Sequence, residues 1–102
     1  MIYVFAVITA KAGMRDRLLA EFQANMPAVH AEPGCVEYRP AVDAEGFGRI
    51  QAAFGPDTFV VIERWDSADA LKAHGSAPHM VAYAAATKDM IASRAIHILS
   101  PV

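Results

Sequence analysis

Apolar and polar residues alternate along residues 59–65, FVVIERW, which is the period-two pattern of a β-strand. One face of this strand carries a carboxylate among apolar side chains, in the set Phe59, Val61, Glu63 and Trp65. Asp66 and Ser67 follow, and either can cap a short helix, which Gly75-Ser76-Ala77-Pro78 then interrupts. The pattern predicts a strand-to-helix corner that gathers Glu63, Trp65, His74 and His79.

The first third of the chain predicts a strand and a helix. Residues 2–10 are apolar on both faces, which is typical of a central strand that is covered on both sides. From Met14 to Ala31 the apolar residues recur at helical spacing, so an amphipathic helix is expected. Pro27 is expected to cause a kink or an irregular last two turns, and Gly34 to end the segment in a left-handed turn.

The remaining segments predict strands and one more helix. The helix that begins at Pro78 is expected to run to about Ala92 or Ser93. The other expected elements are a strand at 35–42, a hairpin tip at 43–48, a return strand at 49–54 and a last strand at 95–99. The predicted order is therefore β-α-β-β-β-α-β.

Two strand-helix-strand units that merge into one antiparallel sheet form the ferredoxin-like α+β fold, with the helices on one face. We expect residues 1–102 to form a single domain of this kind. The strands at 2–10 and 59–65 are apolar on both faces, so the second sheet face must also be covered. A second copy of the chain is the most economical cover, which predicts a homodimer through that face. A ligand pocket is expected between the sheet and the helices.

The composition narrows the classes of function. The 102 residues are 55% hydrophobic and carry a formal net charge of -2, with scattered Lys and Arg, so neither nucleic acid nor a membrane surface is an expected partner. The apolar run at 2–10 has no basic residue before it and ends at Lys11, far short of a membrane span. Cys35 is the only cysteine, so no internal disulfide can form. We expect a cytoplasmic protein.

The residues around the corner resemble a known family. The pattern is Glu32-Pro33-Gly34-Cys35-x-x-Tyr38, then Glu63-x-Trp65-x-Ser67-x-x-Ala70-Leu71-x-x-His74, then Pro78-His79-Met80. Over nearly the whole chain this pattern resembles the antibiotic biosynthesis monooxygenase family, which implies a dimeric ferredoxin-like protein. The resemblance is much less specific for the reaction than for the fold. The family includes quinol monooxygenases without metal, flavin or heme, oxygenases of polyketide phenols, heme-degrading enzymes and an isomerase of a phosphorylated signal metabolite.

The sequence favours some of these branches over others. Heme degraders of the family rely on an asparagine in the first strand, whereas the only asparagine here is Asn25, on the first predicted helix. A phosphorylated substrate favours a cluster of basic residues, and only Arg64 and Lys72 lie near the corner. The first hypothesis is a cofactor-independent monooxygenase that oxidises a dihydroquinone or polycyclic phenol with dioxygen to a quinone. A cofactor-free isomerase and a non-catalytic small-molecule-binding stress-response dimer remain as alternatives.

The first hypothesis assigns a role to each candidate residue. A phenol with a pKa of about 10 must lose its proton before it can give an electron to dioxygen, so the site needs a base. His74 is the expected base, because imidazole titrates near neutrality, and Trp65 and Glu63 complete the catalytic set. Three further residues are expected to bind the substrate: Tyr38, His79 and Tyr83.

Structural alternatives exist for the same residues. Glu63 could accept a hydrogen bond from Trp65, which could itself be a core residue, and His74 could satisfy carbonyls where its helix ends. A metal site is the weaker interpretation, because His74 and His79 are five residues apart, whereas helical metal pairs usually sit three or four apart. The hypothesis therefore includes no metal and no cofactor.

Overall fold

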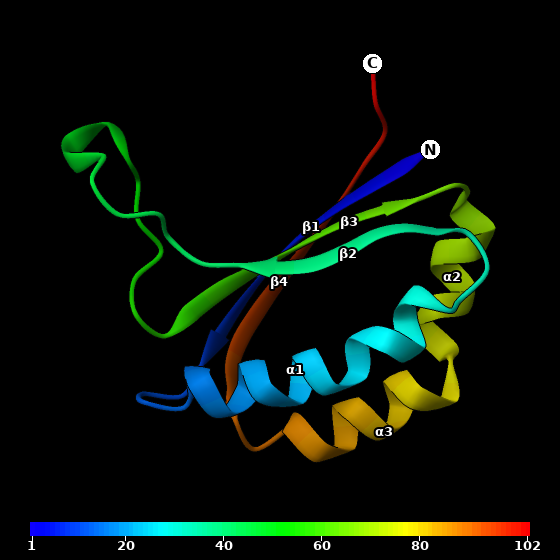
Figure 1. Cartoon of the computed structure of the whole chain (residues 1–102), viewed down its shortest axis with the longest axis horizontal. Coiled ribbons are helices and arrows are strands. Elements are labelled where there is room, and N and C mark those ends of the chain that lie inside the picture. Colours follow the sequence, from blue (N-terminus) through cyan, green and yellow to red (C-terminus); the bar gives the residue numbers. More distant parts are fainter.

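The computed structural model describes all 102 residues and shows two layers, a four-stranded antiparallel sheet and helices over one of its faces (Figure 1). A short 3-10 helix, Gly48–Ile50, lies in the long connection that projects beyond the sheet. The main elements are β1 (Ile2–Ala10), α1 (Arg15–His30), β2 (Cys35–Ala41), β3 (Thr58–Trp65), α2 (Ala68–Ser76), α3 (Pro78–Thr87) and β4 (Ile91–Leu99).

The strand order is β2-β3-β1-β4, so β1 and β3 are central and β2 and β4 are edges. Helix α1 connects β1 to β2, and the α2–α3 pair connects β3 to β4, so each connection passes over one intervening strand. Both connections cross the same face (Figure 1). This is the ferredoxin-like α+β arrangement, and it confirms the predicted fold with helices on one face.

Side-chain alternation decides which residues form the core. β1 and β3 are paired in register from Ile2 opposite Trp65 to Thr9 opposite Thr58, so their inward residues form one continuous surface. The main core residues are Val4, Ala6, Leu18, Phe22, Val29, Phe59, Val61 and Trp65, all buried. Burying each large apolar side chain contributes roughly 1.5–3 kcal/mol, so this sheet-to-α1 contact provides most of the apolar stabilisation.

Helix α1 continues through Pro27 to His30 as a single α-helix, so the proline does not end it. Proline lacks the backbone N–H that would bond the carbonyl of Gln23, which leaves one bond missing in the last turns. The regular ladder resumes at once, because Ala31 N–H donates to the carbonyl of Pro27 at 3.1 Å. None of the helices combines the length and the apolar composition that crossing a membrane requires.

The predicted return strand at 49–54 is wrong. This segment is the 3-10 turn followed by irregular chain, and β2 pairs with β3 directly. The reason lies in Asp43, whose carboxylate accepts hydrogen bonds from the backbone N–H of Phe54 at 3.0 Å and of Gly55 at 2.8 Å. These bonds close the base of the projecting connection, and they lower the pKa of the Asp43 carboxyl. Residues 49–54 therefore do not pair with the sheet.

The predicted end of the last helix, at Ala92 or Ser93, is also wrong. Helix α3 ends at Thr87, whose buried hydroxyl donates to the carbonyl of Tyr83 at 2.8 Å. β4 begins at Ile91, earlier than the predicted 95–99, because its residues pair with the free edge of β1. The helix propensity of the residues after Thr87 favours a longer helix, but the backbone pairing of β4 with the central strand β1 outweighs it.

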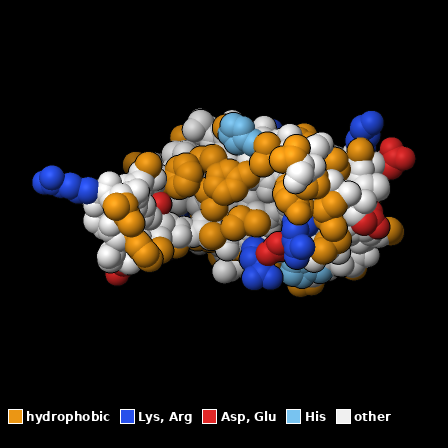
Figure 2. Space-filling view, turned by 90° about the horizontal axis from the view of Figure 1, so that it is seen from above, with side chains coloured by type: hydrophobic (Ala, Val, Ile, Leu, Met, Phe, Trp, Pro, Cys, Tyr) orange, Lys and Arg blue, Asp and Glu red, His pale blue; other side chains and the backbone are white.

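The sheet face opposite the helices has no other element over most of it. Alternation places Tyr3, Phe5, Ile62, His97 and Leu99 on this face, and Tyr3 and Leu99 are 38% and 49% exposed. Figure 2 looks onto the molecule from this side and shows apolar side chains gathered over the sheet. The face therefore has the apolar character that the sequence predicted for a contact surface, whereas the contact itself stays a prediction.

Gly34 brings the start of β2 against the start of α2. Its φ is +86°, and its carbonyl accepts a hydrogen bond from Asp66 N–H at 2.9 Å. A Cβ at this position would lie 2.6 Å from the Cβ of Ala70 and against the carboxylate of Asp66. Only glycine satisfies both the left-handed backbone and this close approach.

Gly34→Ala is expected to destabilise the fold by about 2–4 kcal/mol, because backbone strain of about 1–3 kcal/mol adds to the clash with α2. Gly46→Ala is the matched control, since Gly46 has a φ of +90° but nothing within 4 Å of the position that a Cβ would take. Urea unfolding of both variants measures the difference. Equal losses of stability would show that the contact with Ala70 does not matter.

Candidate functional site

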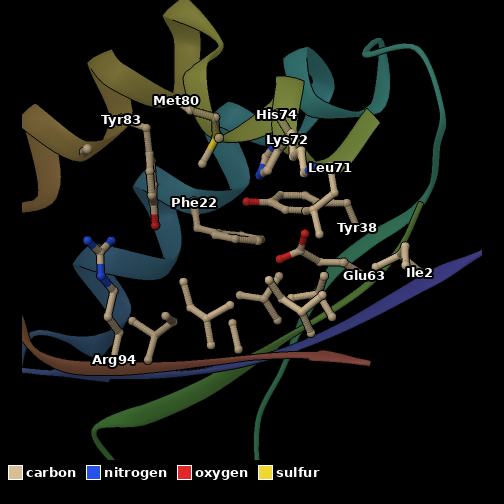
Figure 3. A pocket seen from close by; sticks show the side chains of 18 of the residues that line it. Ile2, Phe22, Tyr38, Glu63, Leu71, Lys72, His74, Met80, Tyr83 and Arg94 are labelled. Atoms are coloured by element: carbon tan, nitrogen blue, oxygen red, sulfur yellow. The ribbon is translucent and has the colours of Figure 1, made fainter. Parts of the chain in front are cut away.

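A cavity of about 590 Å³ lies between the sheet and the helices (Figure 3). Of its 19 lining residues, 14 are hydrophobic, so the cavity suits an apolar or aromatic molecule. Residues of β1, β3 and β4 form its floor, and helices α1, α2 and α3 together with Tyr38 of β2 contribute the rest of the wall. Its ionisable groups, apart from two tyrosines, are Glu63, Lys72, His74 and Arg94. A pocket between sheet and helices is what the sequence predicted.

Glu63 and Trp65 form a buried pair beneath one end of the cavity. The two residues are two apart on β3 and therefore share a face, and the Trp65 indole N–H donates to Oε1 of Glu63 at 2.9 Å. Glu63 is 7% exposed and Trp65 is fully buried. Glu63 lines the cavity and Trp65 does not, so the indole supports the carboxylate from behind.

His74 lies in the last turn of α2, with its imidazole at the same end of the cavity (Figure 3). Helix α2 begins at Ala68, and the hydroxyl of Ser67 caps it by accepting from Ala70 N–H at 3.1 Å. The imidazole packs against Trp65 and Tyr38, with ring centroids 4.8 Å and 5.4 Å away. These contacts fix the orientation of the ring.

Glu32 determines which nitrogen of His74 can accept a proton. Its Oε2 lies 2.8 Å from Nδ1 of His74 and 2.8 Å from Nε2 of His79. An ionised carboxylate can only accept hydrogen bonds, so both of these nitrogens donate. In neutral His74 the proton is then on Nδ1, and Nε2 is an acceptor that makes no hydrogen bond within the protein. The site therefore offers a free proton acceptor.

Tyr38 reaches the cavity because β2 contains a bulge. Cys35 is opposite Trp65 and Tyr38 is opposite Glu63, with one extra residue, Val36, between the regular pairs. Residues three apart on a regular strand face opposite sides, but the extra residue turns both Cys35 and Tyr38 toward the helices. The spacing Cys35-x-x-Tyr38 is thus the sequence signature of the bulge.

Aromatic rings line the middle of the cavity. Phe22 stacks on Tyr38 with centroids 5.0 Å apart and meets Tyr83 edge to face at 6.2 Å. Burial raises the pKa of Tyr38 well above its usual value of 10, and burial together with the charge of Glu21 raises the pKa of Tyr83 to about 12, against an opposing effect of Arg94. Both phenols are therefore neutral hydrogen-bond donors in neutral solution.

The structure brings most of the predicted site residues together. Glu63, His74, Tyr38 and Tyr83 line the cavity, whereas Trp65 lies behind Glu63, and His79 bonds Glu32 and is not part of the lining. Their functional roles stay predictions. Sequence reasoning missed the bridging role of Glu32, although it lies in the Glu-Pro-Gly-Cys motif. It also missed Arg94, because the last strand was expected to begin only at residue 95.

The structure contains no group of three or more His, Cys, Asp and Glu side chains arranged to hold a metal ion. His74 and His79 do approach one carboxylate oxygen, at 2.8 Å each. These are the lengths of hydrogen bonds between each ring and Glu32.

Comparisons with known proteins agree with this architecture. The sequence profile described as antibiotic biosynthesis monooxygenase matches residues 1–86. The chain is 38% identical over 103 aligned residues to the "Probable quinol monooxygenase YgiN" of Escherichia coli (strain K12), and the alignment covers 99% of this chain and 98% of that protein. The protein of the same name from Shigella flexneri matches equally.

Solved structures share the fold. The crystal structure of PA3566 from Pseudomonas aeruginosa superposes with a TM-score of 0.82 at 24% identity, covering 99% of this chain and 93% of that one. The structure of Rv0793 from Mycobacterium tuberculosis has a TM-score of 0.80 at 26% identity, covering 99% of this chain and 94% of that one. The two-layer arrangement is therefore common to proteins of low sequence identity.

The buried carboxylate gives a prediction for the pH dependence of stability. Burial raises the pKa of Glu63 above its usual 4.5, against the opposing effects of the Trp65 hydrogen bond and His74. The folded state therefore binds more protons than the unfolded state between 4.5 and the raised value, and Glu63 makes stability fall as pH rises through that window. Glu63→Gln removes this charge while its amide oxygen can still accept from Trp65.

We expect Glu63→Gln to unfold at higher urea concentration than the parent at neutral pH, with the difference shrinking as the pH falls toward 4.5. Glu37→Gln is the control, because Glu37 lies on the other sheet face, where it bonds Arg39 at 2.9 Å and Arg64 at 2.8 Å. It removes the same charge and is expected not to stabilise. A loss of stability in Glu63→Gln at every pH would contradict the assignment.

Proposed function

Because the chain belongs to the antibiotic biosynthesis monooxygenase family, we propose that it oxidises a dihydroquinone or polycyclic phenol with dioxygen, without a cofactor. The observation that carries this proposal is the free Nε2 of His74, held at the wall of an apolar cavity by the Glu32 hydrogen bond. The relative YgiN is named as a quinol monooxygenase, and its similarity over the whole chain supports the same class of substrate here.

The first step is removal of the phenolic proton. His74 accepts it on Nε2, and the resulting imidazolium is stabilised through its Nδ1–H by the carboxylate of Glu32. This is the base-and-orienter arrangement that general base catalysis uses. The wall of the cavity is mostly apolar, which strengthens the interaction between the new phenolate and the imidazolium.

The second step is oxidation of the phenolate. One electron passes from the phenolate to dioxygen, the two radicals combine at a ring carbon, and the carbon hydroperoxide loses water. For a phenol, one oxygen atom of dioxygen enters the ring, the other leaves as water, and a quinone results. A dihydroquinone treated in the same way gives a hydroxyquinone and water. Tyr83 and Tyr38 remain neutral and can donate hydrogen bonds to these oxygens.

Trp65 and Glu63 act in this proposal by positioning. Trp65 packs on His74 and donates to Glu63, so the indole fixes the imidazole from the side away from the substrate. Glu63 lies at the cavity wall beside His74, where its carboxyl accepts the Trp65 hydrogen bond and so holds the indole in place. His79 adds the second hydrogen bond to Glu32.

An isomerase acting on a small anionic metabolite is the second candidate. The observation in its favour is that two cations, Lys72 and Arg94, line the cavity. Such an enzyme would use His74 as a base without consuming oxygen, and a non-catalytic binding protein would consume neither substrate nor oxygen. Oxygen uptake therefore separates the oxygenase from the other two functions.

We expect His74→Ala to lower the rate of oxygen consumption with dihydroquinones by about 100-fold or more, because general base catalysis is worth about 10²–10⁴. The measurement is oxygen uptake by metal-stripped protein, corrected for spontaneous oxidation of each quinol. Glu32→Gln is expected to lower the rate less than His74→Ala does, because the imidazole of His74 is retained. Some rate is still lost, because an uncharged amide replaces the carboxylate that stabilises the imidazolium.

His79→Asn is the companion variant. It removes the second hydrogen bond to Glu32 and leaves the cavity lining intact, so a smaller loss is expected than for His74→Ala. Circular dichroism of each variant checks that it is folded. A folded His74→Ala protein with the parent rate would rule out His74 as the base, and no uptake by the parent with any quinol would rule out the oxygenase.

We also propose that two copies associate through the open sheet face, and that the protein acts in the cytoplasm. The apolar residues on that face, Tyr3, Phe5, Ile62 and Leu99, support this contact, since a monomer rarely leaves such a surface in water. Both helical layers would then lie on the outside of the dimer, with one cavity in each subunit.

Ile62→Lys, at the middle of β3 on the open face, is expected to convert the dimer to a monomer, because it places a charge in an apolar contact. Val81→Lys is the control, since Val81 is 62% exposed on α3 and does not line the cavity. Sedimentation velocity gives the mass of each species. A parent protein that sediments as a monomer at micromolar concentration would contradict the proposal.

A further inference from the structure

Arg94 is an unpaired cation in the wall of an apolar cavity. It lines the cavity from β4, and its guanidinium makes no hydrogen bond and no ion pair within the protein. The other arginines of the sheet differ, because Arg39 and Arg64 both bond Glu37. Arg94 is exposed at this edge of the cavity, so water satisfies its five donors in the free protein, and two oxygens of an acidic ligand can replace that water.

The position of Arg94 relative to His74 and Glu63 sets the shape of that ligand. Glu63 is opposite Val4 on β1, and Arg94 is opposite Ile8, four residues further along the same strand. Four residues of a strand span about 13 Å, and β3 and β4 lie on opposite sides of β1, about 10 Å apart. The proton-accepting end and the cationic end are therefore well separated along the cavity floor.

Tyr83 adds a second donor at the cationic end. Figure 3 shows the hydroxyl end of its ring directed toward Arg94, with Glu63 and Ile2 at the other side of the view. The charge of Arg94 also opposes the rise of the Tyr83 pKa, which agrees with this arrangement. A neutral phenol beside a guanidinium forms a suitable pair of donors for a carboxylate or phosphate group.

Between these ends the floor is apolar. Ile8, Ala6 and Val4 of β1 and Ile96 and Ile98 of β4 line it. A flat ring system can lie along this floor without leaving a polar group unpaired. The apolar strand residues of the floor offer no partner for a charge, so the charged group of the ligand is placed at the end where Arg94 lies.

From this arrangement we propose that the substrate is a ring system that carries an acidic group, a carboxylate or a phosphate monoester, at the end opposite the hydroxyl that is oxidised. Arg94 and Tyr83 bind the acidic group, and the ring hydroxyl then faces His74. The site for the acidic group does not depend on the proposed function. Only the statement that the ring hydroxyl is oxidised rests on it. The acidic group serves to orient the ring in one direction, so that only one hydroxyl is presented to the base.

Lys72 also lines the cavity, from α2, the helix that carries His74. Its ammonium is a single point charge, whereas the planar guanidinium of Arg94 can hold two oxygens of an acidic group at once. Arg94 also has the Tyr83 hydroxyl beside it. The acidic group is therefore assigned to Arg94, and Lys72→Gln serves as a test of that assignment.

Calorimetric titration of the full chain with naphthoate, naphthyl phosphate and the neutral naphthalenemethanol tests the proposal, because binding requires no turnover. We expect at least one of the two acids to bind about tenfold more tightly than the alcohol, since a hydrogen bond to a charged group is worth about that factor. The acid that binds more tightly identifies the source of the charge as carboxylate or phosphate.

Arg94→Gln is expected to abolish the preference for the acid, so that the ratio of the two dissociation constants falls about tenfold. Arg17→Gln is the matched control: Arg17 is an exposed residue of α1 outside the cavity, and its loss changes the net charge equally. The control is expected to keep the preference. Thermal unfolding confirms that both variants are folded.

Three results would overturn the proposal: no preference for either acid in the parent protein, an equal loss of preference in Arg17→Gln, or a loss in Lys72→Gln with none in Arg94→Gln. None of these results bears on oxygen uptake with neutral dihydroquinones. Conversely, an acid preference that depends on Arg94 in a protein without oxygen uptake would support the anion site and reject the oxygenase.

Discussion

One oxygen atom of Glu32 accepts hydrogen bonds from His74, at the end of α2, and from His79, at the start of α3. Glu32 itself lies in the turn between α1 and β2, so this atom joins segments that are far apart in the sequence. An acceptor shared by two imidazoles at 2.8 Å requires that all three side chains keep their relative positions. The break between α2 and α3 is therefore held in place by the same group that orients the candidate base.

The two carboxylates of the site have different surroundings and therefore different uses. Glu32 has two nitrogen donors, one from each imidazole. Glu63 has one indole donor and is enclosed by apolar side chains, so burial raises its pKa and favours the neutral form. Glu32 therefore anchors the two imidazoles, whereas Glu63 forms part of the cavity wall.

Local patterns in the sequence were sufficient for the fold and for most of the cavity. The alternation in FVVIERW placed Glu63 and Trp65 on one face, and the glycine and proline breaks located His74 and His79. What failed depended on contacts between distant segments. The pattern of residues 49–54 did not reveal that Asp43 would take the N–H groups of Phe54 and Gly55. Nor did the helix-forming residues after Thr87 reveal the pairing of β4 with β1, and with it the position of Arg94.

Trp65 is the only tryptophan of the chain, and it is fully buried with its ring 4.8 Å from the imidazole of His74. Tryptophan dominates the near-ultraviolet emission of a protein, and a protonated imidazole in contact with an excited indole accepts an electron from it and quenches that emission. The light emitted by this protein therefore comes mainly from one ring, which is adjacent to the group proposed to carry the proton. The fold thus contains its own optical indicator of the ionisation state of its base, and no label needs to be attached to read it.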